Sequence, residues 1–331
     1  MDNEKRSLRA GAVVILCALI LRLGMGGFFR PVARLFAQPN MVSLLIYLET
    51  GRIVRFSDSL GDATVFVPVA QTETEPATEG PTLPCFAAAD SGAVEIRGVE
   101  AEADVEALLE KPLQWDLTGD EPTVLIYHSH ATESFTPSPG ENYQESSAYR
   151  TLDRDYNMVS IGTRVAEILE AGGVKVIHDR SLHDYPSYNT SDNQSRESMA
   201  AYLEQYPSIR LVLDLHRDAS GDSSNQLTTH ATVDGEDCAQ LMLVVAAGTS
   251  ARPVPQWQEN LALGLKLQVQ LERAAPGITR YVNLRSSRFN QDLSPGALLV
   301  EVGAAGNTHA EALRAAEVLA EAILTLKHGS K

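Results

Sequence analysis

The sequence predicts an α/β protein whose main domain has three layers (αβα), with helices on both faces of a mostly parallel central sheet. Short apolar runs alternate with stretches of helical periodicity in the second half of the chain, which is the pattern of repeated strand–helix units. Several of these runs are apolar throughout, as expected for strands that are buried on both faces. Two of them lead directly into histidine, at His128 and His216.

The expected elements follow one another from residue 124 onward. Strands are expected at 124–127, 174–177, 209–215, 241–247 and 297–302, and helices at 157–171, 195–205, 259–274 and 308–324. Gly172-Gly173 ends the first helix, because glycine readily adopts the conformation that stops a helix. Thr308 and Glu311 form a capping box that begins the last helix.

The N-terminus has the composition of a membrane anchor. Basic residues precede an apolar stretch, and residues 10–29 are about the 20 residues that a helix needs to cross a bilayer. Arg22 within this span costs roughly 2.5–3.5 kcal/mol, and residues 11–21 also suit a cleavable signal peptide. We interpret residues 1–30 as a cytoplasmic tail and a transmembrane anchor. Both interpretations export the rest of the chain.

The remainder divides into two regions. Residues 31–115 are expected to form a membrane-proximal region with a linker at 71–84 that is rich in proline and glutamate. Within this region, residues 87–112 have the pattern of a strand followed by an acidic helix. Residues 116–331 are expected to form the catalytic domain.

Charge and cysteine content exclude two classes of function. The formal net charge of −16 argues against a nucleic-acid partner, because phosphate contacts require basic residues. No cysteines have the CxxC spacing of a zinc ribbon. Outside the anchor, Cys85 and Cys238 are the possible disulfide partners, and the sequence leaves open whether they pair.

Histidines and acids gather at the predicted strand ends. In parallel sheets, ligands bind at the carboxyl ends of the strands. At this edge, the candidate ligands are His216, one of His128 and His130, and Glu133 as the nearest acid. Two histidines and one carboxylate are the ligand set of many catalytic zinc sites. Each histidine alone is more often a structural residue at a loop, but the pairing favours a metal site. Strand alternation predicts that His128 and His130 point the same way.

Glu301 interrupts the apolar run LLVEVG. A buried carboxylate is costly unless it is paired or lies near a metal ion. The alternative is a solvated residue on an edge strand. If its strand lies beside the two that lead to histidine, Glu301 can take a proton from zinc-bound water and return it to a leaving amine.

Four motifs together resemble the stage II sporulation protein P family, which is related to zinc-dependent N-acetylmuramoyl-L-alanine amidases. They are IYHSHATESFTP at 126–137, HDYPSYNTSDNQSR at 183–196, DLHRDA at 214–219 and LLVEVGAAGNTHAEA at 298–312. The resemblance covers roughly residues 123–324.

The resemblance implies roles for particular residues. It favours His130 over His128 as the first ligand, with His216 as the second and Glu301 as the catalytic acid–base. Glu133 is preferred as the acidic ligand, and Asp153 or Asp155 is the alternative. Arg285 resembles an arginine that the amidases hold near their site, where it orients a carbonyl or carboxylate. His183, Asp184 and Tyr188 are interpreted as lining the groove.

The implied activity is hydrolysis of the amide between N-acetylmuramic acid and L-alanine in peptidoglycan, with Zn²⁺ as cofactor. Cleavage of peptide cross-links is a further activity credited to the family. The implied partners are a companion lytic transglycosylase, stage II sporulation protein D, and the membrane protein stage II sporulation protein M. The expected location is the cell membrane, with the catalytic domain outside the cytoplasm in the septal space during engulfment.

Two other functions remain open from the residues alone. An exported zinc carboxypeptidase or endopeptidase of the cell wall also uses two histidines and a glutamate. A non-catalytic scaffold that binds the wall is the third possibility, although the presence of Glu301 together with both histidines argues against it.

Overall fold

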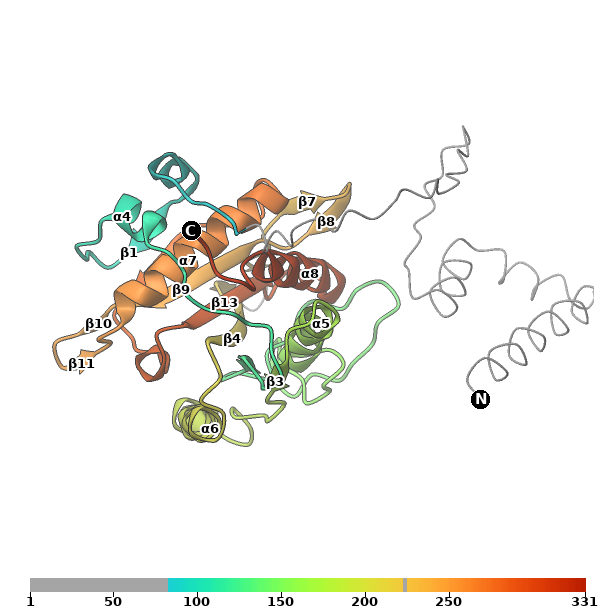
Figure 1. The fold of residues 1–331 in the computed structure, drawn as a ribbon. Helices are drawn as coiled ribbons and strands as arrows, with labels where there is room; N and C mark the ends of the chain where they lie inside the picture. The colour runs from blue at the N-terminus through green and yellow to red at the C-terminus, as the bar shows by residue number, and fades with distance from the viewer. Residues whose placement is uncertain (1–82, 223–224) are drawn as a thin grey trace, which may run out of the picture. The chain divides into compact units, whose positions relative to one another are not determined.

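A seven-stranded sheet forms the centre of the computed structural model, which describes residues 83–222 and 225–331 (Figure 1). The strand order is β1-β12-β9-β13-β4-β2-β3. The strands are β1 (Ile96–Gly98), β2 (Val124–Tyr127), β3 (Val176–His178), β4 (Leu211–Asp218), β9 (Leu241–Ala246), β12 (Val282–Arg285) and β13 (Ala297–Ala304).

The sheet is mostly parallel, as predicted, with one reversal of direction. Strands β3, β2, β4 and β13 are parallel to one another, and so are β9, β12 and β1. The two groups meet at the antiparallel pair of β13 and β9. The carboxyl ends of β2, β4 and β13 therefore share one edge of the sheet with the amino ends of β9 and β12.

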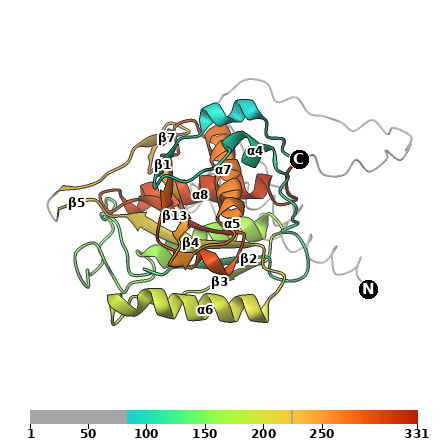
Figure 2. The same ribbon diagram turned by 90° about the vertical axis from the view of Figure 1, so that its left-hand side faces the viewer.

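Helices cover both faces of the sheet (Figure 2). Three of them, α5 (Met158–Ala171), α7 (Trp257–Ala274) and α8 (His309–Thr325), share one large apolar cluster with the strands. On the opposite face, α6 (Ser191–Gln205) packs through Met199 on Leu125 and Val212 of β2 and β4. The predicted αβα layering is therefore present.

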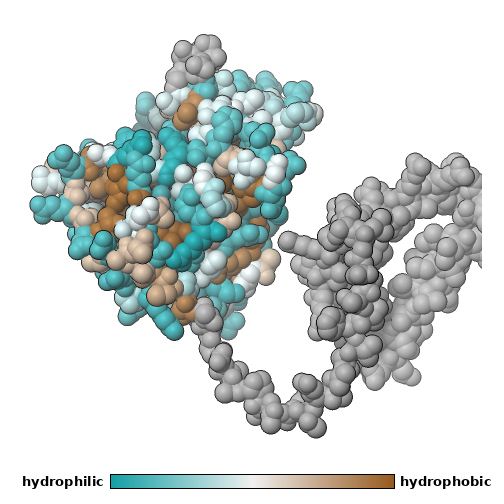
Figure 3. Space-filling view, turned by 90° about the horizontal axis from the view of Figure 1, so that it is seen from above, coloured by the Kyte–Doolittle hydropathy of each residue, from teal (hydrophilic) through white to brown (hydrophobic). Residues whose placement is uncertain are grey.

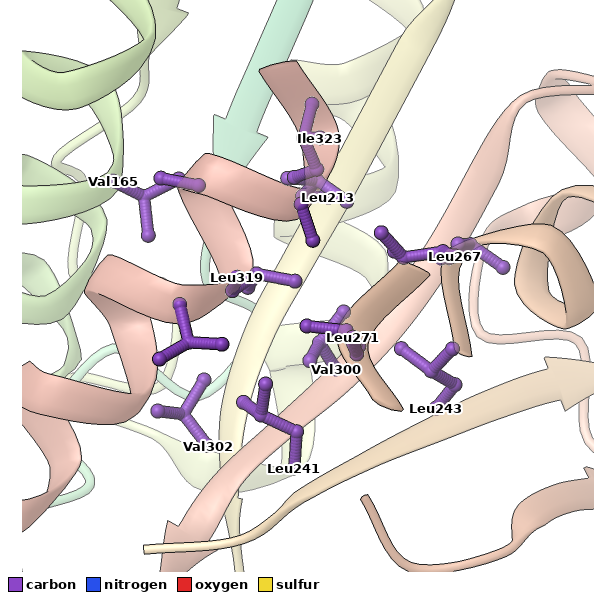
Figure 4. Packing of buried hydrophobic residues seen from close by; sticks show 14 of the residues in the cluster. Val165, Leu213, Leu241, Leu243, Leu267, Leu271, Val300, Val302, Leu319 and Ile323 are labelled. Atoms are coloured by element: carbon purple, nitrogen blue, oxygen red, sulfur yellow. The ribbon is translucent and has the colours of Figure 1, made fainter. Parts of the chain in front are cut away.

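The main core lies between the sheet and the three helices. Val300 and Leu213 of neighbouring strands face Leu319 of α8 and Leu271 of α7, and all four side chains are buried (Figure 4). Burying an aliphatic side chain of this size contributes about 1.5–3 kcal/mol. This packing holds β4 and β13 side by side.

The predicted ends of two helices are confirmed. Gly172 caps the C-terminus of α5, and Gly173 follows with a φ of +85°. Thr308 and Glu311 form the expected capping box of α8, in which each side chain accepts a hydrogen bond from the other residue's backbone N–H. Helix α6 begins earlier than predicted, at Ser191, because a 3-10 turn leads into it.

Several short elements were not predicted from the sequence. Strand β12 has only two apolar residues, and the hairpin of β7 and β8 is polar. Of the remaining elements, α4 (Val105–Glu110) is the expected acidic helix, and the others are η1 (Ala88–Ala93), η2 (Tyr188–Thr190), β5 (Gly221–Asp222), β6 (Asn225–Gln226), β7 (Ala231–Val233), β8 (Glu236–Cys238), β10 (Gly248–Thr249), β11 (Arg252–Pro253) and η3 (Gln291–Leu293).

Part of the expected membrane-proximal region joins the central sheet. Strand β1 pairs in parallel with β12, and α4 packs against α7. Both elements precede residue 116, where we placed the start of the catalytic domain. The strand followed by an acidic helix at 87–112 thus extends the sheet by one strand.

The expected anchor at residues 10–29 lies outside the described residues, as does most of the linker at 71–84. Among the helices that are described, none is both long and apolar enough to cross a bilayer. Cys85 is exposed, Cys238 is buried, and both are free thiols. The surface in Figure 3 is mainly hydrophilic, with scattered hydrophobic patches.

Candidate metal centre and active site

Three of the predicted site residues lie together at the edge where β2 and β4 end. His130 and Glu133 follow β2, and His216 lies near the end of β4. One ligand atom from each of the three side chains lies within 4.8 Å of the others. His130 Nδ1 is 3.7 Å from Glu133 Oε1, and His216 Nδ1 is 3.4 Å from Glu133 Oε2.

This group fits a catalytic metal ion by its donor atoms. Two imidazole nitrogens and one carboxylate converge, and His130 is the member that reaches solvent. Zinc enzymes commonly use this set of three ligands and keep a fourth position open. Glu133, rather than the exposed Asp153 or Asp155, is the acid that lies with the histidines.

A tight turn positions His130 and Glu133. Strand β2 ends at Tyr127, and Glu133 N donates to His130 O to close the turn. Asp184 accepts hydrogen bonds from the backbone N–H and the hydroxyl of Thr132. The turn is therefore tied to the polar loop after β3, which holds both candidate ligands in place.

Asp214 orients His216. His216 Nε2 lies 2.9 Å from Asp214 Oδ1, which leaves Nδ1 to face Glu133. Asp214 also accepts hydrogen bonds from the backbone N–H and the hydroxyl of Ser129. A carboxylate on the second nitrogen fixes the tautomer of a metal-binding histidine and increases its basicity. The sequence analysis missed this role, although Asp214 lies two residues before His216 and hence on the same face of the strand.

The charges around Glu133 and His216 compensate one another. Burial would raise the pKa of Glu133, but the Arg217 guanidinium and His216 lower it well below its usual range. Burial would likewise lower the pKa of His216, but Asp214 and Glu133 raise it well above its usual value. Arg150 Nη2 lies 3.3 Å from Glu133 Oε1 and adds a second positive charge. The raised pKa favours a protonated His216 between the carboxylates of Asp214 and Glu133.

Glu301 lies beside this group on the neighbouring strand. In the pairing of β13 with β4, Glu301 is directly opposite His216. Its Oε2 atom is buried and has no hydrogen-bond partner among the described residues. Burial raises the pKa of Glu301 to about 8, and the negative charges of Glu133 and Asp218 act in the same direction. A carboxyl group with a pKa near neutrality can both accept and donate a proton.

The structure does not bring His128 to this group. The chain turns immediately after Tyr127, so the alternation that would align His128 with His130 does not continue. The His128 ring is buried, with Nδ1 3.0 Å from Leu215 O and Nε2 2.9 Å from His178 Nε2. Burial lowers the pKa of His128 to about 4, so the ring is neutral at pH 7.

Arg285 also lies apart from the group. It pairs with Ala246 at the end of β9, whereas Glu301 pairs with Met242 near the start of that strand. Four residues along a strand correspond to about 13 Å. Because β9 runs antiparallel to β13, the exposed Arg285 lies towards the opposite edge of the sheet. At the edge of the sheet that carries the candidate ligands, the loop before β12 contributes Arg280, whose Nη1 lies 2.6 Å from Asp218 Oδ2.

The polar loop after β3 has two parts with different environments. His183 and Asp184 are buried, and His183 Nε2 lies 3.1 Å from Asp179 Oδ2. Tyr188 is 55% exposed and stacks on the His130 ring at a centroid distance of 4.5 Å. Of the three residues that we expected to line the groove, Tyr188 presents an aromatic face to solvent beside the candidate metal ligands.

A protein-family model and a curated relative both match most of this chain. The model of the stage II sporulation protein P family matches residues 70–324. Stage II sporulation protein P of Bacillus subtilis (strain 168) is 27% identical over 244 residues, which cover 70% of this chain and 57% of that protein. The chain thus matches a little over half the length of this curated relative.

Solved structures of low sequence identity are also similar to the chain. N-acetylmuramoyl-L-alanine amidase AmiC2 of Nostoc punctiforme is 17% identical with a TM-score of 0.37, and the match covers 62% of this chain and 97% of that one. The N-acetylmuramyl-L-alanine amidase Ami1 of Mycobacterium smegmatis is 18% identical with a TM-score of 0.38, over 63% of this chain and 95% of that one.

Replacing each histidine of the HSH segment tests the ligand assignment. We expect His130→Ala to lose bound zinc, because the substitution removes one of the three donor atoms. His128→Ala should keep zinc but lower the free energy of unfolding by about 1–3 kcal/mol, because it leaves a buried hydrogen-bond partner unpaired. Metal analysis after zinc loading and chemical denaturation measure the two effects. Loss of zinc from His128→Ala alone would reverse the assignment.

Asp214→Asn tests the orientation of His216. We expect zinc affinity to fall about 10- to 100-fold, as it does when such an outer partner is lost. Competition with a chromogenic chelator measures this affinity. Asp155→Asn is the matched control, because Asp155 is exposed, and it should bind zinc as the parent does. Equal affinities for all three proteins would show that Asp214 does not support the ligand.

The raised pKa of Glu301 predicts how stability depends on pH in the metal-free protein. A carboxyl that ionises near pH 8 when folded and near 4.5 when unfolded holds an extra proton in the folded state between these values. Its contribution to the free energy of unfolding therefore falls as pH rises from about 4.5 to about 8. Glu301→Gln should abolish this fall and be the more stable protein above pH 8. Denaturation curves at several pH values test this, and parallel pH profiles would contradict it.

Proposed function

We propose that this chain, which belongs to the stage II sporulation protein P family, is a zinc-dependent peptidoglycan hydrolase. The bond it cleaves is the amide between N-acetylmuramic acid and L-alanine. The observation that carries this proposal is the position of Glu301 directly opposite His216 in the sheet, with a buried Oε2 atom that has no hydrogen-bond partner among the described residues. Amide hydrolysis needs an acid–base group beside an electrophilic centre; Glu301 would supply the first, and a zinc ion held beside it would supply the second.

His130, Glu133 and His216 would hold the zinc ion. A zinc ion bound by such a set polarises a carbonyl group and lowers the pKa of water. Asp214 keeps the His216 ring in the orientation that presents Nδ1, and Arg217 and Arg150 keep Glu133 ionised.

Glu301 would carry the proton. It accepts a proton from the attacking water and passes it to the nitrogen of L-alanine as the amide bond breaks. Burial raises the pKa of Glu301 to about 8. Its protonated and ionised forms are therefore close in free energy near neutral pH, which suits both accepting and donating the proton. The partnerless Oε2 atom is free to make these contacts.

Tyr188 would contact the sugar. Its exposed ring stacks on His130 and is adjacent to Arg150, whose guanidinium carbon lies 5.0 Å from the ring centroid. Aromatic side chains with one solvent-facing side offer a large, rigid contact surface at low conformational cost. The muramic acid ring would lie on this side of the scissile amide.

The proposed place of action is the cell wall outside the cytoplasmic membrane during sporulation, with residues 10–29 as the anchor. Stage II sporulation proteins D and M are the proposed partners, on the basis of the family. An anchor with a flexible linker would keep the catalytic domain close to the wall and so raise its local concentration there.

Product analysis tests the activity. The zinc-loaded chain, incubated with purified peptidoglycan, should release peptides with a new free amine on L-alanine. Glu301→Gln should keep its zinc but lose activity by about 10²- to 10⁴-fold, because an amide side chain cannot accept the proton. A released C-terminal amino acid would instead indicate a carboxypeptidase, and binding without any product would indicate a scaffold. A Glu301→Gln protein with normal turnover would exclude the acid–base role.

A further inference from the structure

A polar pocket lies at the same edge of the sheet as the candidate active site. Its volume is about 440 Å³, and it is formed by residues around the start of β1, the C-terminal half of α7 and the loop before β12. Thr279 of that loop bridges to Leu241, which is paired with Val302 of β13. Val302 immediately follows Glu301, so the loop before β12 is level with Glu301 and two strands away from it, and the β1 side of the pocket is one strand further.

Arg280 connects the pocket with the active site. It is part of the pocket wall, and its Nη1 atom lies 2.6 Å from Asp218 Oδ2. Asp218 is the last residue of β4, two residues after His216. The ion pair therefore links the pocket wall to the strand that carries a candidate metal ligand.

The pocket contains a buried acceptor that lacks a donor. Gln268 belongs to the pocket wall and is 3% exposed. Its Nε2 atom donates to Arg280 O and to Thr279 Oγ1, which fixes the orientation of the amide. Oε1 has no hydrogen-bond partner in the part of the chain that the structure describes. An unpaired buried acceptor costs about 1–3 kcal/mol, and an N–H group of a ligand would satisfy it.

Two other polar groups of the pocket, Glu272 and Arg97, differ in whether a ligand can bind to them. Glu272 is already engaged, because its carboxylate accepts from Gly277 N, Thr279 N and the Thr279 hydroxyl. Arg97 is available: its guanidinium carbon lies 4.5 Å from the centre of the Tyr281 ring, and its side chain is 59% exposed.

Arg97 pairs with Glu95, whose side chain is 60% exposed. Exposed ion pairs of this kind contribute little to stability, so a ligand carboxylate can replace Glu95 at small cost. The pocket thus offers an acceptor for an N–H group, a guanidinium for a carboxylate and an aromatic face.

We propose that this pocket is a subsite for the peptide part of the substrate. It would bind a peptide segment in which an N–H group lies near a free carboxylate. Neighbouring strands are about 4.8 Å apart, and β12 and β1 are two and three strands from β13, so the pocket spans roughly 10–14 Å from Glu301 along the sheet. An extended peptide advances about 3.3 Å per residue, which places the bound segment roughly three to four residues from the cleaved amide. This inference rests on the proposed function and deepens it.

Peptide binding without turnover tests the subsite. The full chain carrying Glu301→Gln is titrated by calorimetry with the synthetic peptide L-Ala-D-Glu-L-Lys-D-Ala, which has no sugar and no muramoyl amide. Arg97→Ala in this background should weaken binding at least fivefold, and Arg97→Lys should weaken it less. Gln268→Met should also weaken it. Arg252→Ala is the matched control, because Arg252 is equally exposed but lies on the β10–β11 hairpin beyond the opposite end of β9.

A chemical variant of the peptide provides a second test. The same peptide with its carboxylates converted to amides should bind the parent as weakly as the acid binds Arg97→Ala. Equal binding of the acidic peptide to the parent and to Arg97→Ala would overturn the subsite, as would equal binding of acid and amide. Because no bond is cleaved in these titrations, peptide binding that depends on Arg97 supports the subsite even if the chain fails to release L-alanine amines from peptidoglycan.

Discussion

The parallel pairing of β4 with β13 is the constraint on which the candidate active site depends. This pairing places Glu301 directly opposite His216, and the β2–β4 pairing brings the turn with His130 and Glu133 to the same edge. Both strands are held by the apolar core beneath α7 and α8, with Leu213 and Val300 buried at its centre. The packing of the hydrophobic face of the sheet therefore fixes the distances between these polar side chains. Their own interactions in water would be too weak to do so.

Burial gives these polar groups their chemical character. Glu133 is surrounded by positive charge and stays ionised, whereas Glu301 forms no ion pair within the described residues and burial raises its pKa to about 8. Two carboxyl groups on either side of β4 thus have opposite tendencies, which is the condition for one to bind a cation and the other to move a proton. His216 lies between them, and its charge is set by Asp214 and Glu133.

Local sequence chemistry predicted the elements and the metal-binding group, but not the placement of residues that depends on long-range pairing. The capping box of α8 and the end of α5 follow from short patterns, as does the gathering of histidines and Glu133 at one strand edge, whereas the choice of His130 over His128 came from the family resemblance. The position of Arg285 depends on the reversal between β13 and β9, which no local pattern encodes. Strand β12 was missed for a related reason, because it is stabilised by two neighbouring strands rather than by its own composition.

The same reversal explains how one edge of the sheet can combine catalysis with recognition. In a fully parallel sheet, only the loops that follow the strands would reach the metal-binding group. Here the loop before β12 lies at this edge too, and Arg280 of that loop pairs with Asp218 at the end of β4. Tyr188, from the loop that follows β3, stacks on His130. Under the proposed function, a substrate whose sugar contacts Tyr188 and whose peptide extends towards Arg280 would pass Glu301, and the strand order would set the direction of its peptide.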